Sequence, residues 1–420
     1  MSRLNWLLSR IRRTLWVRVA LYALLGLGAA LLASLSSRFL AGQAPLDISS
    51  DAIDSLLTII ASSMLAVTTF SVGALTAAYG GATSNATPRA TPLLTEDGVV
   101  QRSVSTFVGS FVFSIVALIA SKVSVYGPEG RAILFLVTLG VIVLIVIALL
   151  RWINQLTKLG RVGDTIARIE QATDGAMKAR IALPFLGGRA LEGGYQGTPV
   201  LSEEVGYVQF VDTDALSEIA EEGEVDIDVH VLPGSFVFEG SVLACVPASD
   251  SPLMDKRAEA IRETFTIGPV RTFDQDPRFG LVVLSEVALR ALSPGINDPG
   301  TAIDVIGRQA RLLTYWGDAW AEAEGCEAEY PRIRAPALHC DDLFEDAFTL
   351  IGRDGAGHVD VMLRLVKALQ ALARIGPPAA RAAALHQLQV ALVRAEVALT
   401  GADDRRRLQA AAGMFAVADR

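Results

Sequence analysis

The sequence predicts an α-helical membrane domain of four transmembrane helices, followed by a cytoplasmic α+β domain with a small β module and a helical C-terminal part. Four long apolar stretches, with no charge well inside any of them, precede about residue 160. Short alternating apolar runs separated by glycine turns then fill residues 197–250, a pattern typical of strands. Residues 251–420 return to helical periodicity.

The composition argues against several classes of function. The chain has 420 residues, of which 51% are hydrophobic, and a net charge of −8. The negative charge argues against a nucleic-acid partner. Its three cysteines lack CxxC spacing, which argues against a disulfide framework or a zinc site and favours a reducing compartment. We expect no cofactor.

Residues 1–18 form a basic segment in which five arginines alternate with leucine, isoleucine and tryptophan. Such a segment can lie as an amphipathic helix among lipid headgroups. It can equally be a basic tail that only sets membrane orientation. The sequence favours neither interpretation over the other.

The membrane domain is expected to occupy residues 19–160. The four apolar stretches run over residues 19–40, 55–80, 104–123 and 132–150. Each approaches or exceeds the roughly 20 residues that cross a bilayer. The flanking lysines and arginines place both termini in the cytoplasm, which predicts a multi-pass protein of the inner membrane. A helical extension and a Gly-rich linker follow at residues 161–196.

The second apolar stretch contains a stripe of small residues at alternating four- and three-residue steps. Besides Ala66, the stripe consists of Ser62, Thr69, Gly73, Thr76 and Gly80. Small residues on a membrane helix favour close packing, and packing inside one subunit is the interpretation that we favour. The alternative is a pore in a homo-oligomer, because hydroxyls and backbone can line one. The absence of ionisable residues inside the spans argues against a proton-coupled carrier.

The loop after this stretch contains an arginine, Arg89, between two helix-breaking prolines, Pro88 and Pro92. A cation at the membrane surface beside a break in a helix could bind an anion or a lipid phosphate. The favoured interpretation is an arginine that sets topology.

In the cytoplasmic domain, KRAEAIRETFTIG predicts a helix closed by Gly268. The stretch that follows predicts a helix over residues 281–292, a break at Ser293, and a new helix that Asp298 caps. Around these two helix ends lie Arg271, Asp276, Arg278, Arg290, Asn297 and Asp298. They could form an anion or ligand site at a helix N-terminus. Caps and buried Arg–Asp pairs with a structural role are the interpretation that we favour.

The C-terminal part predicts helices at residues 359–375, 379–399 and 403–417. The run His339-Cys340-Asp341-Asp342 offers metal-binding side chains, but adjacent residues rarely bind one metal ion, and Asp341 is expected to cap a helix. We therefore predict no metal site. No hydrolase, kinase, nucleotide-binding or metalloprotease motif is present, so the chain is not expected to be an enzyme.

Two stretches resemble one family. SNATPRATPLLTEDGVVQRSVSTFVGSFVF and RTFDQDPRFGLVVLSEVALRALSPGINDPGTAIDVI are similar to bacterial predicted membrane proteins grouped as a domain of unknown function, DUF2254. Where that family has Ser-Pro-Arg, this chain has Thr87-Pro88-Arg89. The resemblance implies four spans ahead of a soluble domain. It implies no activity, substrate or catalytic residue.

These observations leave three functions open. The first is a homo-oligomeric membrane assembly acting as an ion or small-solute channel with a cytoplasmic regulatory domain. The second is a non-conducting sensor or scaffold whose cytoplasmic domain binds a ligand or a partner. The third is an enzyme at the membrane face. The expected partners are the lipid bilayer and further copies of the chain, while a protein partner stays unknown.

Overall fold

The structure is a computed structural model that describes residue 6 and residues 15–36, 49–123, 128–194, 197–248, 254–323 and 325–418. The described residues form two compact units. The first, called here the apolar unit, lies within Leu7–Ser84 and Thr91–Asp164. The second, called the α+β unit, lies within Met1–Trp6, Asn85–Ala90 and Thr165–Arg420.

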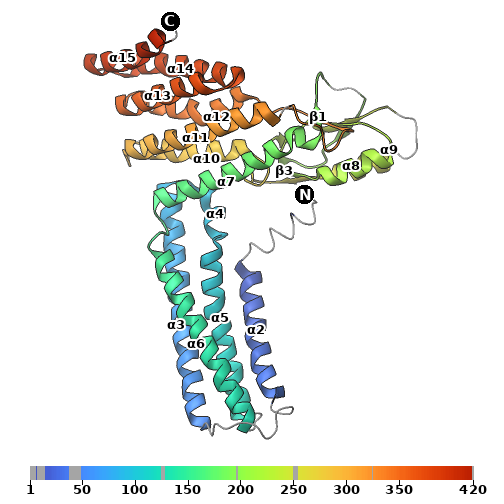
Figure 1. The fold of residues 1–420 in the computed structure, drawn as a ribbon, viewed down its shortest axis with the longest axis vertical. Coiled ribbons are helices and arrows are strands. Elements are labelled where there is room, and N and C mark those ends of the chain that lie inside the picture. Colours follow the sequence, from blue (N-terminus) through green and yellow to red (C-terminus); the bar gives the residue numbers. More distant parts are fainter. Residues whose placement is uncertain are drawn as a thin grey trace. The chain divides into compact units, whose positions relative to one another are not determined.

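The regular elements described in the apolar unit are helices (Figure 1). Its helices are α2 (Leu15–Ser36), α3 (Ser50–Asn85), α4 (Thr91–Thr95), α5 (Gly98–Lys122) and α6 (Pro128–Leu156). Among the described residues, α3, α5 and α6 are long and apolar enough to cross a membrane, and a shorter apolar helical stretch, Val17–Gly28, lies in α2. Four apolar helices are therefore present where four were predicted, and three of them are candidate membrane spans within the described residues.

Helices α2 and α5 approach closely through glycines. A Cβ atom at Gly26 would lie 2.6 Å from the carbonyl oxygen of Gly109, and one at Gly109 would lie 2.9 Å from the carbonyl oxygen of Tyr22. Missing side chains let the two backbones touch, as is common where membrane helices cross.

A buried carboxylate joins the start of α5 to the end of α6. Asp97 caps α5 by accepting hydrogen bonds from the backbone N–H groups of Val99 and Val100. Its second oxygen accepts a 2.6 Å hydrogen bond from Nε2 of Gln155. One carboxylate therefore satisfies free N–H groups at the start of α5 and binds the last turn of α6.

The α+β unit contains two sheets. Their strands are β1 (Arg189–Ala190), β2 (Thr198–Leu201), β3 (Gly206–Val211), β4 (Ile227–Val229), β5 (Phe236–Val237), β6 (Val242–Val246), β7 (Phe265–Gly268) and β8 (Ile333–Ala335). One sheet has the order β1-β8-β4-β6-β2, and the other has the order β5-β3-β7. Strand β8 pairs in parallel with both β1 and β4, although it comes about 100 residues after β4.

Two sequence predictions in this region were wrong. The helix expected to close at Gly268 ends at Glu263, and FTIG forms β7, which pairs antiparallel with β3. Pairing with β3 stabilises these residues as a strand, although their sequence continues the helical pattern. The segment predicted as a linker contains β1, which pairs with β8.

The helices of the α+β unit are α7 (Val162–Ala182), α8 (Thr213–Glu222), α9 (Met254–Glu263), α10 (Pro277–Leu292), α11 (Pro299–Ala323), α12 (Cys340–Asp354), α13 (Val359–Ile375), α14 (Pro378–Ala398) and α15 (Ala402–Ala418). Helices α10 to α14 pack against one another (Figure 1). The three predicted C-terminal helices are confirmed within two residues. Helix α12 begins at Cys340, with His339 in the cap position that the sequence assigned to Asp341.

The N-terminal segment contributes one described residue, Trp6. Its indole ring stacks on Phe210 at 5.1 Å, and its Nε1 donates a hydrogen bond to Asp274 at 2.9 Å. Trp6 is therefore buried in the α+β unit rather than among headgroups. The remaining residues of the predicted amphipathic segment up to residue 14 lie outside the described residues.

Candidate functional site

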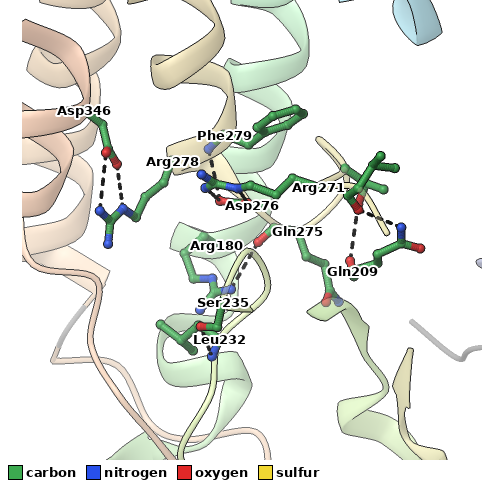
Figure 2. A network of polar contacts seen from close by, with 12 residues as sticks. Arg180, Gln209, Leu232, Ser235, Arg271, Gln275, Asp276, Arg278, Phe279 and Asp346 are labelled. Carbon is green, nitrogen blue, oxygen red and sulfur yellow. Dashed lines mark hydrogen bonds and ion pairs between the residues drawn. The ribbon is translucent and has the colours of Figure 1, made fainter. Parts of the chain in front are cut away.

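The predicted arginine–aspartate cluster begins at the N-terminus of α10, where Asp276 is the cap (Figure 2). Its carboxylate accepts a hydrogen bond from the backbone N–H of Phe279 at 3.1 Å. Arg271 holds both carboxylate oxygens, from Nε at 2.8 Å and from Nη2 at 3.0 Å. Asp276 is only 3% exposed. A buried, doubly bonded carboxylate of this kind rigidifies its surroundings.

A second arginine, Arg180 of α7, lies in the same cluster (Figure 2). It is buried, and its Nη2 donates to the backbone carbonyl of Gln275 at 3.2 Å. Burial lowers the pKa of Arg180 to about 10, while the negative charge of Asp276 opposes that shift. Asp276 therefore balances the charge of two arginines, one of which the sequence did not indicate.

The next residue of the cluster, Arg278, binds another pair of carboxylates. Its Nε donates to Asp346 at 2.6 Å, and its Nη1 donates to Asp342 at 2.9 Å. Burial raises the pKa of Asp346, and the hydrogen bond from Arg278 acts against that rise. Asp342 and Asp346 stand four residues apart on one face of α12, so the pairing fastens α10 to α12.

The turn between α10 and α11 is exposed and separate from this cluster. Asn297 there adopts a positive φ of 50°, and the backbone N–H of Asp298 donates to the carbonyl of Ala291 at 2.7 Å. Asp298 accepts hydrogen bonds from the backbone N–H and the hydroxyl of Thr301, at 3.1 and 2.6 Å. These bonds lower the pKa of Asp298. The predicted cap is confirmed.

The six predicted residues therefore do not form one site. Arg271, Asp276 and Arg278 lie at the start of α10, whereas Asn297 and Asp298 lie after its end. Arg290 is exposed near that end. Among the described residues, the hydrogen bonds and ion pairs of Asp276 and Asp298 either cap a helix or join parts of the α+β unit. This agrees with the interpretation that both aspartates have a structural role.

We expect Asp298→Ala to cost about 1 kcal/mol of stability, because it removes an exposed N-cap and strands no buried cation. Pulse proteolysis of the detergent-solubilised full chain across a urea series measures this loss. Asp298→Ser, which keeps a capping oxygen, is the matched control and should behave nearly as the parent. A loss of 3 kcal/mol or more would indicate that Asp298 balances a buried charge after all.

Arg89 also lies in the α+β unit, with the short helical turn Pro88–Ala90. Its Nη1 forms an ion pair with Oε1 of Glu286 on α10, and the hydroxyl of Thr87 donates to Oε2 of the same carboxylate at 3.0 Å. The sequence did not indicate Glu286, because no local pattern relates positions about 200 residues apart. Arg89 is paired with a carboxylate rather than left for an anion.

Among the described residues, nothing in the same subunit covers the stripe on α3, which argues against the favoured interpretation of packing inside one subunit. Its five predicted residues are all exposed. A Cβ atom at Gly73 or Gly80 would meet no described atom within 4 Å. The helix buries its opposite face, where Leu57, Met64 and Leu75 lie. The reason is that α3 packs on its subunit through large apolar residues, and the small ones point away.

Among the described residues, no group of three or more metal-binding side chains comes together. A different concave surface, of about 430 Å³, lies on α11. Arg308, Arg311 and Arg364 line it together with Asp304. Glu170 of α7 forms ion pairs with Arg308 and Arg311.

Apolar helices of spanning length, joined in one chain to an α+β unit, define a membrane protein. The comparison with protein families agrees. Residues 12–371 match the family described as predicted membrane protein (DUF2254), and the chain belongs to that family.

Curated relatives resemble the chain over a shorter stretch. An uncharacterized protein of Mycobacterium bovis and one of Mycobacterium tuberculosis are each 38% identical to it over 112 residues, which is 26% of this chain. The matched stretch spans 21% of the length of these relatives. No solved structure matches the chain.

Proposed function

We propose that this protein is a homo-oligomeric channel of the bacterial inner membrane, in which α3 helices from several copies face one another and the α+β unit regulates conduction. One observation carries the proposal. The small and hydroxylated residues of α3 are exposed on the side opposite its buried face. In a membrane, such a surface is better suited to another helix or to water than to lipid tails.

The hydroxyl groups of the stripe suit a narrow polar path. Ser62, Thr69 and Thr76 each donate back to the carbonyl four residues earlier, at 2.9, 3.0 and 3.0 Å. Their donors are satisfied within the helix, while their oxygens can still accept a bond from water or contact a cation. The large exposed residues Ile59 and Phe70 flank the stripe and suit contact with lipid.

The proposed orientation follows from charge. One end of the apolar helices carries Arg18, Arg102, Arg151 and Lys158, whereas the other carries Asp51 and Asp54 beside Lys122 and Arg131. Under the positive-inside rule, this charge distribution supports an orientation with the arginine-rich end, both termini and the α+β unit in the cytoplasm. With α2 counted as a span, the chain crosses the membrane four times.

A route for regulation is also available. Helix α3 continues into Asn85–Ala90, whose Thr87 and Arg89 bind Glu286 of α10. A rearrangement of α10 would therefore pull directly on the cytoplasmic end of the proposed pore helix. Coupling of this kind requires a two-state element that both sites bias.

Cross-linking tests the assembly. In a Cys326→Ser, Cys340→Ser background, Gly73→Cys is expected to give disulfide-linked dimers in membranes under a mild oxidant, because the stripes of two copies would face each other. The matched control is Val143→Cys, on the exposed surface of α6. Equal cross-linking at both positions, or none at Gly73→Cys, would contradict an interface along α3.

Conduction is tested separately in planar bilayers. Reconstituted protein should carry currents, and Thr69→Phe should reduce them strongly by placing an apolar ring in the path, while Val143→Phe should leave them unchanged. Protein that cross-links through α3 but stays silent across ions and voltages would leave the assembly intact and exclude the channel.

The sensor remains a second candidate function, favoured by the arginine-lined surface on α11. Arg364 is exposed there and, within the described structure, has no ion-pair partner. A silent protein whose melting temperature rises with millimolar pyrophosphate, and whose Arg364→Gln variant does not respond, would support the sensor over the channel.

A further inference from the structure

A groove of about 740 Å³ lies between α2, α5 and α6 of the apolar unit. Its walls are mostly apolar and include Leu25 of α2 and Leu144 of α6, which are 60% and 59% exposed. Gly140 forms part of the wall, and a Cβ atom there would meet nothing within 4 Å. The volume is in the range of small-molecule pockets, and the lining suits a hydrocarbon chain.

One end of this groove is basic. Arg102 in the first turns of α5 and Arg151 in the last turns of α6 both line it. Among the described residues, neither side chain forms an ion pair with a carboxylate. Both helices end on this side, so the two guanidinium groups lie at the depth where a lipid headgroup would lie.

A third arginine lies at the same end. A Cβ atom at Gly98 would be 3.6 Å from Nη1 of Arg18 and 3.7 Å from Nη1 of Arg102. Arg18 therefore lies close to Arg102 at this end of the groove. Basic pockets between membrane helices on the cytoplasmic side are typical sites for anionic lipid headgroups.

We propose that this groove binds one anionic phospholipid, whose phosphate contacts Arg102 and Arg151 and whose acyl chain lies along α2 and α6. The apolar wall favours a lipid over a soluble anion, and the arginines favour an anionic headgroup over a zwitterionic one. The site is separate from the stripe on α3, so the proposal does not depend on conduction.

Native mass spectrometry of the detergent-purified full chain tests the site with added phosphatidylglycerol, or with phosphatidylcholine of the same acyl chains. We expect one phosphatidylglycerol to bind tightly. Arg102→Gln and Arg151→Gln should each weaken binding about fivefold, and the double variant about thirtyfold. Arg131→Gln, near the opposite end of α6, removes the same charge and should have no effect.

A second variant tests the groove itself. Gly140→Phe keeps all the arginines but fills the space beside Leu144, so it should also reduce phosphatidylglycerol binding. Size-exclusion profiles like that of the parent check that each variant is folded. Equal binding of the two lipids, unchanged binding in the double variant or in Gly140→Phe, or displacement of the lipid by millimolar inorganic phosphate would each overturn the proposal.

Discussion

Asp276→Ala is expected to destabilise the α+β unit by about 3–5 kcal/mol. The substitution removes the cap of α10, which alone costs about 1 kcal/mol. It also leaves Arg271 without its bidentate partner and removes a negative charge that favours the charged form of the buried Arg180. A stranded buried cation accounts for the larger share. Against a total stability of about 5–15 kcal/mol, the loss is a large fraction of the free energy of unfolding.

The urea midpoint from pulse proteolysis of the full chain measures this effect. Asp298→Ala is a matched comparison, since both aspartates cap a helix that begins with proline, but only Asp276 is buried. Asp276→Asn keeps an acceptor of similar size and should lose an intermediate amount, because it removes the charge alone. Equal losses for Asp276→Ala and Asp298→Ala would show that burial of the arginines adds nothing.

Local signals in the sequence predicted the end of α10 and the start of α11, whereas α10 begins at Pro277 and not at the predicted residue 281. The Asp-Pro pairs at 276 and 298 each place an acceptor beside a residue that starts a helix well, and both aspartates are caps. The Gly-Pro-Pro stop at residues 376–378 likewise separated α13 from α14 to within one residue. Such features depend only on neighbouring residues, so a single sequence is enough to predict them.

Contacts between distant segments could not be predicted in the same way. Nothing near Arg89 indicates Glu286, and nothing near Asp276 indicates Arg180. The sequence of β7 was predicted to be the end of a helix. Its strand conformation depends on pairing with β3, which lies more than 50 positions earlier in the chain. The outward stripe of α3 shows a further limit, since a helical period tells which residues share a face but not which face is buried.

Both chain segments that lead from the apolar unit into the α+β unit contact helix α10. Asn85–Ala90 binds it through Glu286. Helix α7, which follows α6 in the chain, contacts it where Gly280 lies against Thr173. Any ligand that shifts α10 would act on both segments together, so the fit between α10 and α7 matters for function as well as for stability.

Gly280→Ala is expected to destabilise the α+β unit by about 1–3 kcal/mol, although alanine is the better helix former by roughly 0.5–1 kcal/mol. The added Cβ atom would lie 2.7 Å from Cβ and 2.8 Å from Cγ2 of Thr173, which is fully buried and donates to the carbonyl of Ile169 at 2.7 Å. A β-branched side chain held in this way cannot turn aside.

Pulse proteolysis of the full chain measures the change in the free energy of unfolding that Gly280→Ala causes. The sign of this change is the decisive result. Thr173→Ala in the same chain removes the hydroxyl and the methyl group that the new Cβ atom would contact. The double variant should therefore lose less stability than the sum of the two single losses, which is a favourable coupling free energy. Gly175→Ala on α7, where a Cβ atom meets nothing within 4 Å, is the control and should be neutral or stabilising. If Gly280→Ala were as stable as Gly175→Ala, the two helices could not be packed backbone to side chain at this point, and α7 would not constrain α10.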